Sequence, residues 1–251
     1  MLYIPVALFG LIVGSFLNVC IYRLPRRQSI VWPASGCPSC GHALSWYENI
    51  PVLSYLALRG HCRTCRAPIS VVYPVIELAT SATFVVMFTR FGLQPLLAVR
   101  LVFACAMIVL FVIDLKHKIL PNAITVSGIV AGFAASFLVP PGWFDSLVGV
   151  VAGAGVLFVI GEVYFRVRHE EGLGMGDVKM LGMIGAFLGW KLMLVTMVIA
   201  SLLGSIVGLT VVATRKGGMK SALPFGTFLA IGALVAAVAG DAILDWYLGF
   251  Y

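Results

Sequence analysis

Residues Gly172 to Lys179 read GLGMGDVK and lead directly into an apolar run. The segment places Asp177 at the mouth of a predicted membrane helix, and an ionisable residue in such a position is a functional hypothesis by default. Gly174 and Gly176 precede it, and because they carry no Cβ they let a backbone or a substrate approach closely. The alternative interpretation is that Asp177 only caps the helix N-terminus, where Asp is strongly preferred.

A second carboxylate favours the functional interpretation. Asp114 closes the apolar run Leu101 to Ile113, and the predicted topology brings Asp114 and Asp177 to the same side of the membrane. The two acids are therefore a candidate functional pair, and the glycines before Asp177 are the candidate loop for substrate approach.

The composition excludes a soluble domain. The chain has 251 residues, of which 61% are hydrophobic and 11% charged, and its mean hydropathy is +1.05. A membrane helix needs roughly 20 apolar residues, and strand alternation is absent, so we predict an all-α polytopic membrane protein. The net charge of +7 does not indicate a nucleic-acid partner, because basic residues of membrane proteins gather in cytoplasmic loops.

Eight apolar segments are predicted to cross the membrane. The sixth is short, so it is tilted, buried among its neighbours or continuous with the seventh. The first lacks the basic start and cleavage site of a signal peptide. Three regions follow: a first span in 1–22, a polar insert in 23–72 and a membrane core in 73–251. The predicted spans are Met1 to Tyr22, Tyr73 to Phe91, Pro95 to Asp114, Leu120 to Val139, Phe144 to Phe165, Asp177 to Trp190, Leu192 to Thr214 and Leu223 to Leu244.

The basic residues predict the orientation, because they are enriched on the cytoplasmic side. If the insert is cytoplasmic, both termini lie outside, and both candidate acids lie at the cytoplasmic boundary. The basic residues that then fall inside are Lys116, Lys118, Arg166, Arg168, Lys179, Arg215, Lys216 and Lys220, whereas Arg90, Arg100, Lys191, Asp145, Asp241 and Asp245 fall outside.

The insert contains two CxxC pairs about twenty residues apart, Cys37 with Cys40 and Cys62 with Cys65. This spacing predicts tetrahedral zinc coordination by four thiolates. The reducing cytoplasm argues against two disulfides, and an insert of about 50 residues needs a staple because its core is small. Redox-active dithiols are the alternative.

Four other residues of metal-binding type are expected to have no ligand role. His42 and His61 adjoin the cysteine pairs, but four thiolates already complete a site. Cys20 and Cys105 lie in apolar spans and are expected to be packing residues.

The acids available to a basic substrate are Glu48, Glu77, Glu170 and Glu171, and for each we expect a solvated or structural role.

Ordered motifs over nearly the whole chain resemble the prepilin peptidases, also called type IV leader peptidases, which are membrane aspartic proteases of the GxGD class. Two positions depart from the pattern: the family often has Asp where Asn122 stands and Pro where Thr227 stands, and neither is expected to be catalytic. The matching motifs are GSFLNVCIYRLP at Gly14 to Pro25, CPSC and CRTC in the insert, NIPVLSYLALRG at Asn49 to Gly60, YPVIELA at Tyr73 to Ala79, DLKHKILPN at Asp114 to Asn122, GLGMGDVKMLGMIGAFLGW at Gly172 to Trp190 and LPFG at Leu223 to Gly226.

The resemblance implies an enzyme of the bacterial inner membrane with its active site on the cytoplasmic side. Such enzymes cut the basic leader from prepilins and from pseudopilins of type II secretion, after a glycine, and many then methylate the new amine with S-adenosylmethionine. It implies Asp114 and Asp177 as the catalytic pair. One carboxylate would activate water while the other, protonated, donates a proton. Two close acids in a partly desolvated site should share a proton, although Lys116, Lys118 and Lys179 oppose this.

Three parts of this interpretation stay open. No glycine-rich fingerprint for a nucleotide appears, so the residues themselves do not indicate where a methyl donor binds. A zinc-stabilised transporter or channel component, with the two acids in an ion path, is an alternative function. Cleavage of other membrane substrates by the same GxGD chemistry is another.

Overall fold

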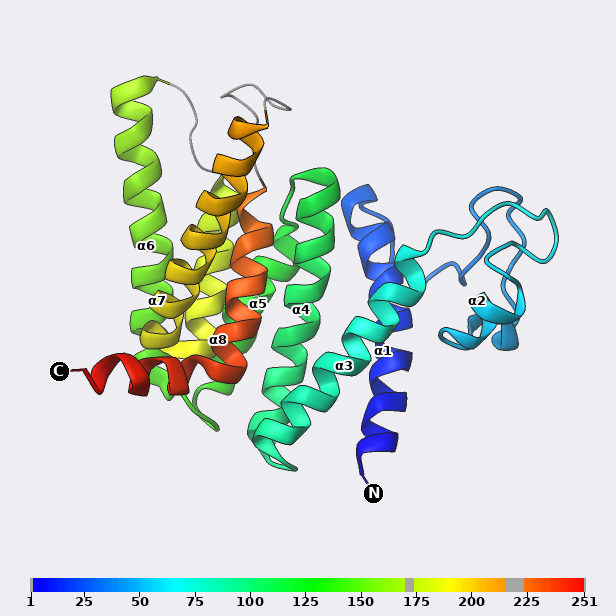
Figure 1. Cartoon of the computed structure of the whole chain (residues 1–251), viewed down its shortest axis with the longest axis horizontal. Coiled ribbons are helices and arrows are strands. Elements are labelled where there is room, and N and C mark those ends of the chain that lie inside the picture. The colour runs from blue at the N-terminus through cyan, green and yellow to red at the C-terminus, as the bar shows by residue number, and fades with distance from the viewer. Residues whose placement is uncertain (1, 170–173, 215–223, 251) are drawn as a thin grey trace. The chain divides into compact units, whose positions relative to one another are not determined.

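The computed structural model describes residues 2–169, 174–214 and 224–250, and these form helices with two isolated β-bridges. Contacts divide the chain into two compact units, Met1–Leu93 and Gln94–Tyr251, and each is described by itself (Figure 1). Within the described residues, six helices are long and apolar enough to cross a membrane. The prediction of an all-helical, multi-pass membrane protein is confirmed.

The first unit is built on two antiparallel helices, α1 (Tyr3–Arg23) and α3 (Val72–Phe91). Glycines allow their backbones to meet: a Cβ on Gly14 would lie 2.7 Å from the Cα of Glu77. At the end nearest the insert, the Asn18 side-chain amide donates to the carbonyl of Tyr73 at 3.1 Å. Small residues are the usual means of close helix packing in lipid, where no hydrophobic force drives association.

Between α1 and α3 lies the polar insert, which has little regular structure. Its elements are η1 (Leu24–Arg26), η2 (Trp46–Asn49) and α2 (Leu53–Ala57). Two tight turns hold the cysteine pairs, and each is closed by the same pair of backbone bonds. In the first, Cys37 N donates to His42 O and Gly41 N to Cys37 O; in the second, Cys62 N donates to Ala67 O and Arg66 N to Cys62 O.

Among its described residues, the second unit contains five helices around a core of large apolar side chains. They are α4 (Pro95–His117), α5 (Asn122–Ala135), α6 (Trp143–Arg168), α7 (Met175–Ala213) and α8 (Phe225–Leu248). The fully buried side chains include Phe103, Met107, Leu110, Ile113, Met180, Leu181, Met183, Ile184, Met193 and Leu229.

Helix α7 is two helices joined at Gly189, whose φ of 78° and ψ of 171° are not helical. Only glycine adopts such a conformation readily, and here the chain reverses direction (Figure 1). There is also no room for a side chain at Gly189, because its Cβ would lie 2.9 Å from the Cβ of Pro141. The indole of Trp190, just beyond the reversal, donates to Asp145 at 3.2 Å.

Glycine contacts fix the directions of the other helices. The first arm of α7 runs antiparallel to α6, since Gly149 meets Gly185 and Gly153 meets Leu181. It runs parallel to α5, because Gly128 and Gly132 meet Met183 and Phe187 in the same order. The second arm is antiparallel to α8, where Gly204 meets Phe228 and Gly240 meets Leu192. The end of α4 and the starts of α5, α7 and α8 therefore lie at one end of this unit.

The predicted spans correspond to apolar helices, with two differences. Leu120 to Val139 contains the short helix α5 of 14 residues, which is below the length needed to cross a bilayer alone. Asp177 to Trp190 and Leu192 to Thr214 are the two arms of α7. The predicted regions 1–22, 23–72 and 73–251 were divided by composition, which placed α3 in the membrane core. In the structure α3 belongs to the same compact unit as α1, because the two helices pack along their length.

Candidate active site

Three helix ends meet at one end of the second unit and carry the predicted acids. Asp114 lies in the last turn of α4, and Asp177 is the third residue of α7. The start of α8, where Pro224 is the N-cap, completes the site. The order of helix directions described above brings these residues together, although 63 positions separate the two acids in the sequence.

Asp114 is almost completely buried, with 5% of its surface exposed. Its Oδ2 accepts two hydrogen bonds from Thr227, one from the backbone amide at 2.7 Å and one from the hydroxyl at 3.1 Å. The helix ends just after it, because Lys118 is left-handed and its amide donates back to the Asp114 carbonyl at 2.8 Å. With Oδ2 held by two donors, Oδ1 is the oxygen that remains for a water molecule or a substrate.

Asp177 is half-buried and faces three groups. The backbone amides of Gly174 and Gly226 donate to its carboxylate, and Asp114 is close enough for the two charges to interact. The bond from Gly174, the N-cap of α7, is the helix-capping role that the alternative interpretation assigns to Asp177. Capping alone does not account for Gly226 and Asp114, which come from other helices, so the residue has a cap and a partner acid at once.

The first turn of α8 donates one amide to each acid. Gly226 donates to Asp177 and the next residue, Thr227, donates to Asp114. The first amides of a helix have no partner within it, and the helix dipole is positive at this end, so both features suit carboxylates. Gly226 has no room for a side chain, because a Cβ would lie 3.0 Å from Oδ2 of Asp114 and 2.9 Å from Leu120 Cδ1.

The predicted approach loop lies beside the acids. A Cβ on Gly176 would lie 3.0 Å from that of Leu120, whereas one on Gly174 would make only an ordinary contact, 3.4 Å from the Asp177 carboxylate. Gly174 is exposed, so it is the more open of the two glycines. Gly172, at the start of the quoted segment, lies outside the described residues.

The two departures from the family pattern both lie at this end of the unit. Thr227, which was expected not to be catalytic, holds Asp114 through two hydrogen bonds. A proline there would have no amide proton to donate. Asn122 accepts a hydrogen bond from the Lys179 ammonium at 3.0 Å, so one of the lysines expected to act on the acids is engaged with an uncharged side chain.

Residues Gly226, Thr227 and Leu120 complete the site, and sequence reasoning did not assign them. The sequence LPFG could have indicated this helix start, because a proline stands two residues before a glycine where an apolar run begins. The predicted cytoplasmic residues Glu170, Glu171, Arg215, Lys216, Lys220 and Leu223, and the predicted outer residue Tyr251, lie outside the described residues.

The four cysteines of the insert form a single cluster. Their sulfur atoms all lie within 4.8 Å of one another, and the Cys37 and Cys65 sulfurs are 3.8 Å apart. Backbone amides of Cys40 and Ser39 donate to Cys37 and lower the pKa of its thiol to about 6, whereas desolvation and the neighbouring cysteines raise the pKa of the Cys40 thiol to about 11, so the metal ion itself must favour the thiolate at Cys40. A thiolate is the form that binds a metal ion, and four thiolates at this separation suit a tetrahedral ion.

The neighbouring histidines do not enter the cluster. His61 Nδ1 is 2.7 Å from the carbonyl of Arg59, and His42 Nε2 is 3.2 Å from Glu48 Oε2. Cys20 is buried and Cys105 half-buried, and both lie in apolar helices. The expectation that these four residues bind no metal stays a prediction.

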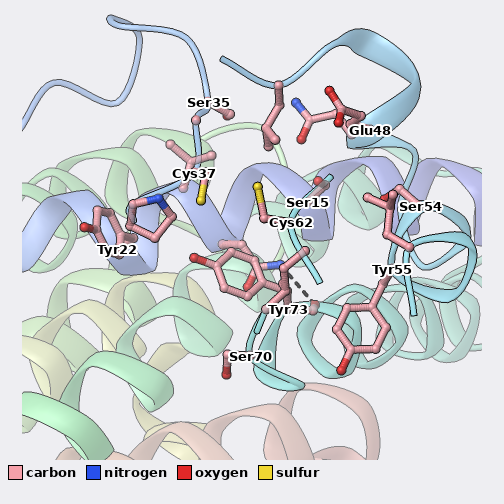
Figure 2. A pocket seen from close by; sticks show the side chains of 18 of the residues that line it. Ser15, Tyr22, Ser35, Cys37, Glu48, Ser54, Tyr55, Cys62, Ser70 and Tyr73 are labelled. Atoms are coloured by element: carbon pink, nitrogen blue, oxygen red, sulfur yellow. Dashed lines mark hydrogen bonds between the residues drawn. The ribbon is translucent and has the colours of Figure 1, made fainter. Parts of the chain in front are cut away.

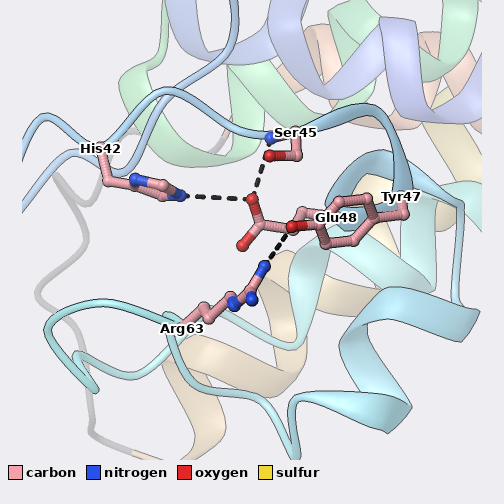
Figure 3. A network of polar contacts seen from close by, with 5 residues as sticks. All are labelled: His42, Ser45, Tyr47, Glu48 and Arg63. Atoms are coloured by element: carbon pink, nitrogen blue, oxygen red, sulfur yellow. Dashed lines mark hydrogen bonds and ion pairs between the residues drawn. The ribbon is translucent and has the colours of Figure 1, made fainter.

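Glu48 and Glu77 are buried, since each is 7% exposed, so of the solvated or structural role expected for them only the structural one remains. Figure 3 shows the Glu48 carboxylate between the His42 ring and the Ser45 amide, which donates at 2.9 Å, with the Arg63 to Tyr47 hydrogen bond beside it. The Ser45 amide, and to a lesser extent His42, hold the pKa of Glu48 below its ordinary value. These contacts give the insert an internal polar core.

Comparisons with known proteins match two consecutive regions of the chain. Residues 8–91 match the Bacterial Peptidase A24 N-terminal domain and residues 101–209 match the Type IV leader peptidase family. Similar curated proteins carry the name prepilin leader peptidase/N-methyltransferase. The one from Pseudomonas putida is 36% identical over 93% of this chain and 89% of its own length, and that from Pseudomonas aeruginosa is 34% identical over 97% and 92%.

A further relative of the same name, from Myxococcus xanthus, is 46% identical over 84% of this chain. The matched region spans 64% of that relative's length, slightly less than two thirds. No solved structure matches the chain.

Proposed function

Because this chain belongs to the type IV leader peptidase family, we propose that it is an aspartic endopeptidase that removes the leader from type IV prepilins or type II secretion pseudopilins and then methylates the new N-terminus. The observation that carries the proposal is the meeting of Asp114 and Asp177 at three helix ends, with one α8 amide donated to each acid.

In the proposed reaction Asp114 and Asp177 hold a water molecule between them. One carboxylate takes a proton from this water as it attacks the scissile carbonyl, and the other, protonated, donates its proton to the carbonyl oxygen. The first acid then passes the proton it took from water to the leaving amine, and the second takes its proton back as the carbonyl re-forms. Thr227 fixes Oδ2 of Asp114, so the carboxyl group cannot rotate away, and Oδ1 faces the reacting atoms. The α8 amides that hold both acids keep their positions rigid, which is worth orders of magnitude in rate.

The substrate is proposed to arrive along the exposed Gly174. A prepilin carries an apolar helix that lies in the bilayer and a basic leader on the cytoplasmic side, so its junction reaches the membrane boundary. If each long helix, the short helix α5 and each arm of α7 cross the inner membrane once, the insert and both acids lie on the cytoplasmic side. The basic residues Lys116, Lys118, Arg166, Arg168 and Lys179 support this orientation.

The insert is proposed to hold one structural zinc ion through Cys37, Cys40, Cys62 and Cys65. The donor set fits, because four sulfurs within 4.8 Å of one another leave room for one tetrahedral ion. S-adenosylmethionine is the proposed methyl donor and would supply an electrophilic methyl group to the new amine.

Coexpression with candidate precursors, followed by mass spectrometry of the mature N-terminus, tests the proposal. We expect a product that begins one residue after a glycine and carries one additional methyl group. An unprocessed precursor, or processing that continues in a strain producing Asp177→Asn at equal level, would refute the peptidase. Cleavage without methylation would refute only the second activity, and cleavage confined to other membrane proteins would favour a general GxGD protease.

A further inference from the structure

The space beside the buried carboxylates differs between the two units. In the first unit, Glu77 lines a cavity of about 410 Å³ between the insert and the nearest ends of α1 and α3. Figure 2 shows Tyr22, Tyr55 and Tyr73 among the side chains that line this cavity. In the second unit, the glycines beside the acid pair leave space that one side chain, Leu120, takes up. An open cavity admits a ligand, whereas a filled space limits what a substrate can place there.

Leu120 lies in the short connection between α4 and α5, where the chain fixes its position. The left-handed Lys118 ends α4 just after Asp114, and Pro121 is the N-cap of α5. A residue that precedes proline is restricted to extended conformations, so Leu120 has little backbone freedom. Its side chain is half-buried and is held at the helix ends that carry the acids.

The Leu120 side chain packs against two glycines, one beside each acid. A Cβ on Gly176, directly before Asp177, would lie 3.0 Å from the Leu120 Cβ and 3.2 Å from its Cδ1. A Cβ on Gly226 would lie 2.9 Å from the same Cδ1 and 3.0 Å from Oδ2 of Asp114. The leucine methyl group and the acid oxygen therefore border a space too small for one more methyl group.

This space adjoins the position that the proposed reaction gives to the substrate. The scissile carbonyl must lie within hydrogen-bond reach of both acids, at about 3 Å. The α-carbon of the residue before the cut is bonded directly to the carbonyl carbon. A side chain on that residue would therefore begin at the apolar wall that Leu120 forms between the two acids.

We propose that Leu120 is the specificity-determining residue that restricts the position before the scissile bond to glycine. The inference rests on the proposed peptidase function, in which the cut follows a glycine, and it names the side chain that rejects larger residues. Leu120 acts by occupying space and takes no part in proton transfer. One methyl group in an apolar pocket changes kcat/KM by about 10–200-fold, so the natural enzyme should prefer glycine to alanine by a factor in this range.

The test compares two forms of one precursor as substrates of the purified full chain, the natural form and a form with alanine in place of the glycine before the cut. Leu120→Ala removes the Cγ and both methyl groups. It should raise the ratio of kcat/KM for the alanine form over the glycine form by about tenfold or more. Leu120→Val removes the Cδ1 contact at Gly226 and keeps the Cβ contact at Gly176, so the ratio should rise by less. Leu120→Met conserves the size of the side chain and should keep the natural ratio.

Ile119→Ala is the matched control, because it removes the same number of carbon atoms from the neighbouring residue of the connection. Ile119 is 45% exposed and is not among the side chains nearest to Gly176 or Gly226, so its replacement should leave the ratio unchanged. A purely structural role of Leu120 would lower the turnover of both precursors by the same factor. The ratio therefore separates exclusion of a side chain from support of the acids.

Each outcome is decisive. A folded Leu120→Ala enzyme with the natural ratio would refute the role of Leu120 while leaving the peptidase in place, and so would a natural enzyme that cleaves both precursors equally well. If Leu120→Ala does not fold, the same ratio measured for Leu120→Val decides the question. No cleavage of the glycine precursor by the natural protein would refute the proposed peptidase itself, and this inference with it.

Discussion

Two buried carboxylates of this protein receive the same backbone contact in different surroundings. Asp114 accepts the Thr227 amide and Glu77 accepts the Val52 amide, each at 2.7 Å. Asp114 has a second acid beside it at the start of α8, whereas Glu77 lines a cavity and forms no ion pair within the described residues. Burial makes both carboxylates candidates for a function, and their neighbouring groups distinguish the roles that can be proposed for them.

The largest effect is expected from removing Asp114 or Asp177, the two acids that meet at the start of α8. Asp114→Asn or Asp177→Asn should lower the rate of leader cleavage by roughly 10³-fold or more, because one carboxylate cannot be both base and acid in the same step. Cleavage of a detergent-solubilised precursor, with each variant at matched folded concentration, measures this effect.

The control for that experiment is Asp245→Asn, an exposed acid on α8, which should cleave at the natural rate. The paired-acid interpretation fails if a folded Asp177→Asn enzyme retains more than a tenth of the natural turnover.

Metal removal should affect the insert of the first unit, Met1–Leu93, and leave the second unit, Gln94–Tyr251, intact. Chelation, or Cys37→Ser, should open the insert to protease, because thiolate ligation contributes directly to the folding of small zinc domains. The helices α4 to α8 should stay resistant. Limited proteolysis with metal analysis measures both effects, and Cys105→Ser, the same change in α4, should keep its metal. A Cys37→Ser protein with full zinc content would contradict the assignment of ligands.

The smallest effect is expected from the group that holds Asp114. Thr227→Val keeps the backbone amide and the shape of the side chain but removes the 3.1 Å hydroxyl contact. We expect turnover to fall about tenfold with KM nearly unchanged. A hydrogen bond to a charged group contributes roughly 1.5–3 kcal/mol, and the lower end of this range corresponds to about a tenfold change in rate. Thr227→Ser should restore most of the rate. An effect on KM alone would assign Thr227 to substrate binding instead.

Much of this arrangement is local in the sequence and was predictable from it. Apolar length predicted the helices, the asymmetry of basic residues gave an orientation to test, and CxxC spacing predicted the cysteine cluster. Asp114 and Asp177 were identified because acids at the ends of apolar runs are rare. By the same rule, Glu77 inside YPVIELA was a stronger candidate than we took it to be.

What escaped prediction depends on contacts between distant segments. Thr227 meets Asp114 across 113 positions, and Val52 meets Glu77 across 25. No period or spacing within one helix encodes such a pairing. A reversal near Lys191 was expected between the sixth and seventh predicted spans, but the residue that makes it, Gly189, was not identified. One glycine in an apolar run usually continues the helix, and only the packing against Pro141 reveals the turn.

The shortness of two neighbouring helices has a consequence for how water reaches the acids. Helix α5 has 14 residues, or about 21 Å of rise, and the arm of α7 before Gly189 is about as long, whereas the hydrocarbon layer is about 30 Å thick. The arm of α7 is buried among its neighbours, so α5 is the member of this pair that can border lipid, and lipid beside α5 is expected to thin to match its length. Such a depression in the bilayer would bring the aqueous phase toward the helix ends that carry Asp114 and Asp177, so the proposed hydrolysis would need no sealed channel for its water.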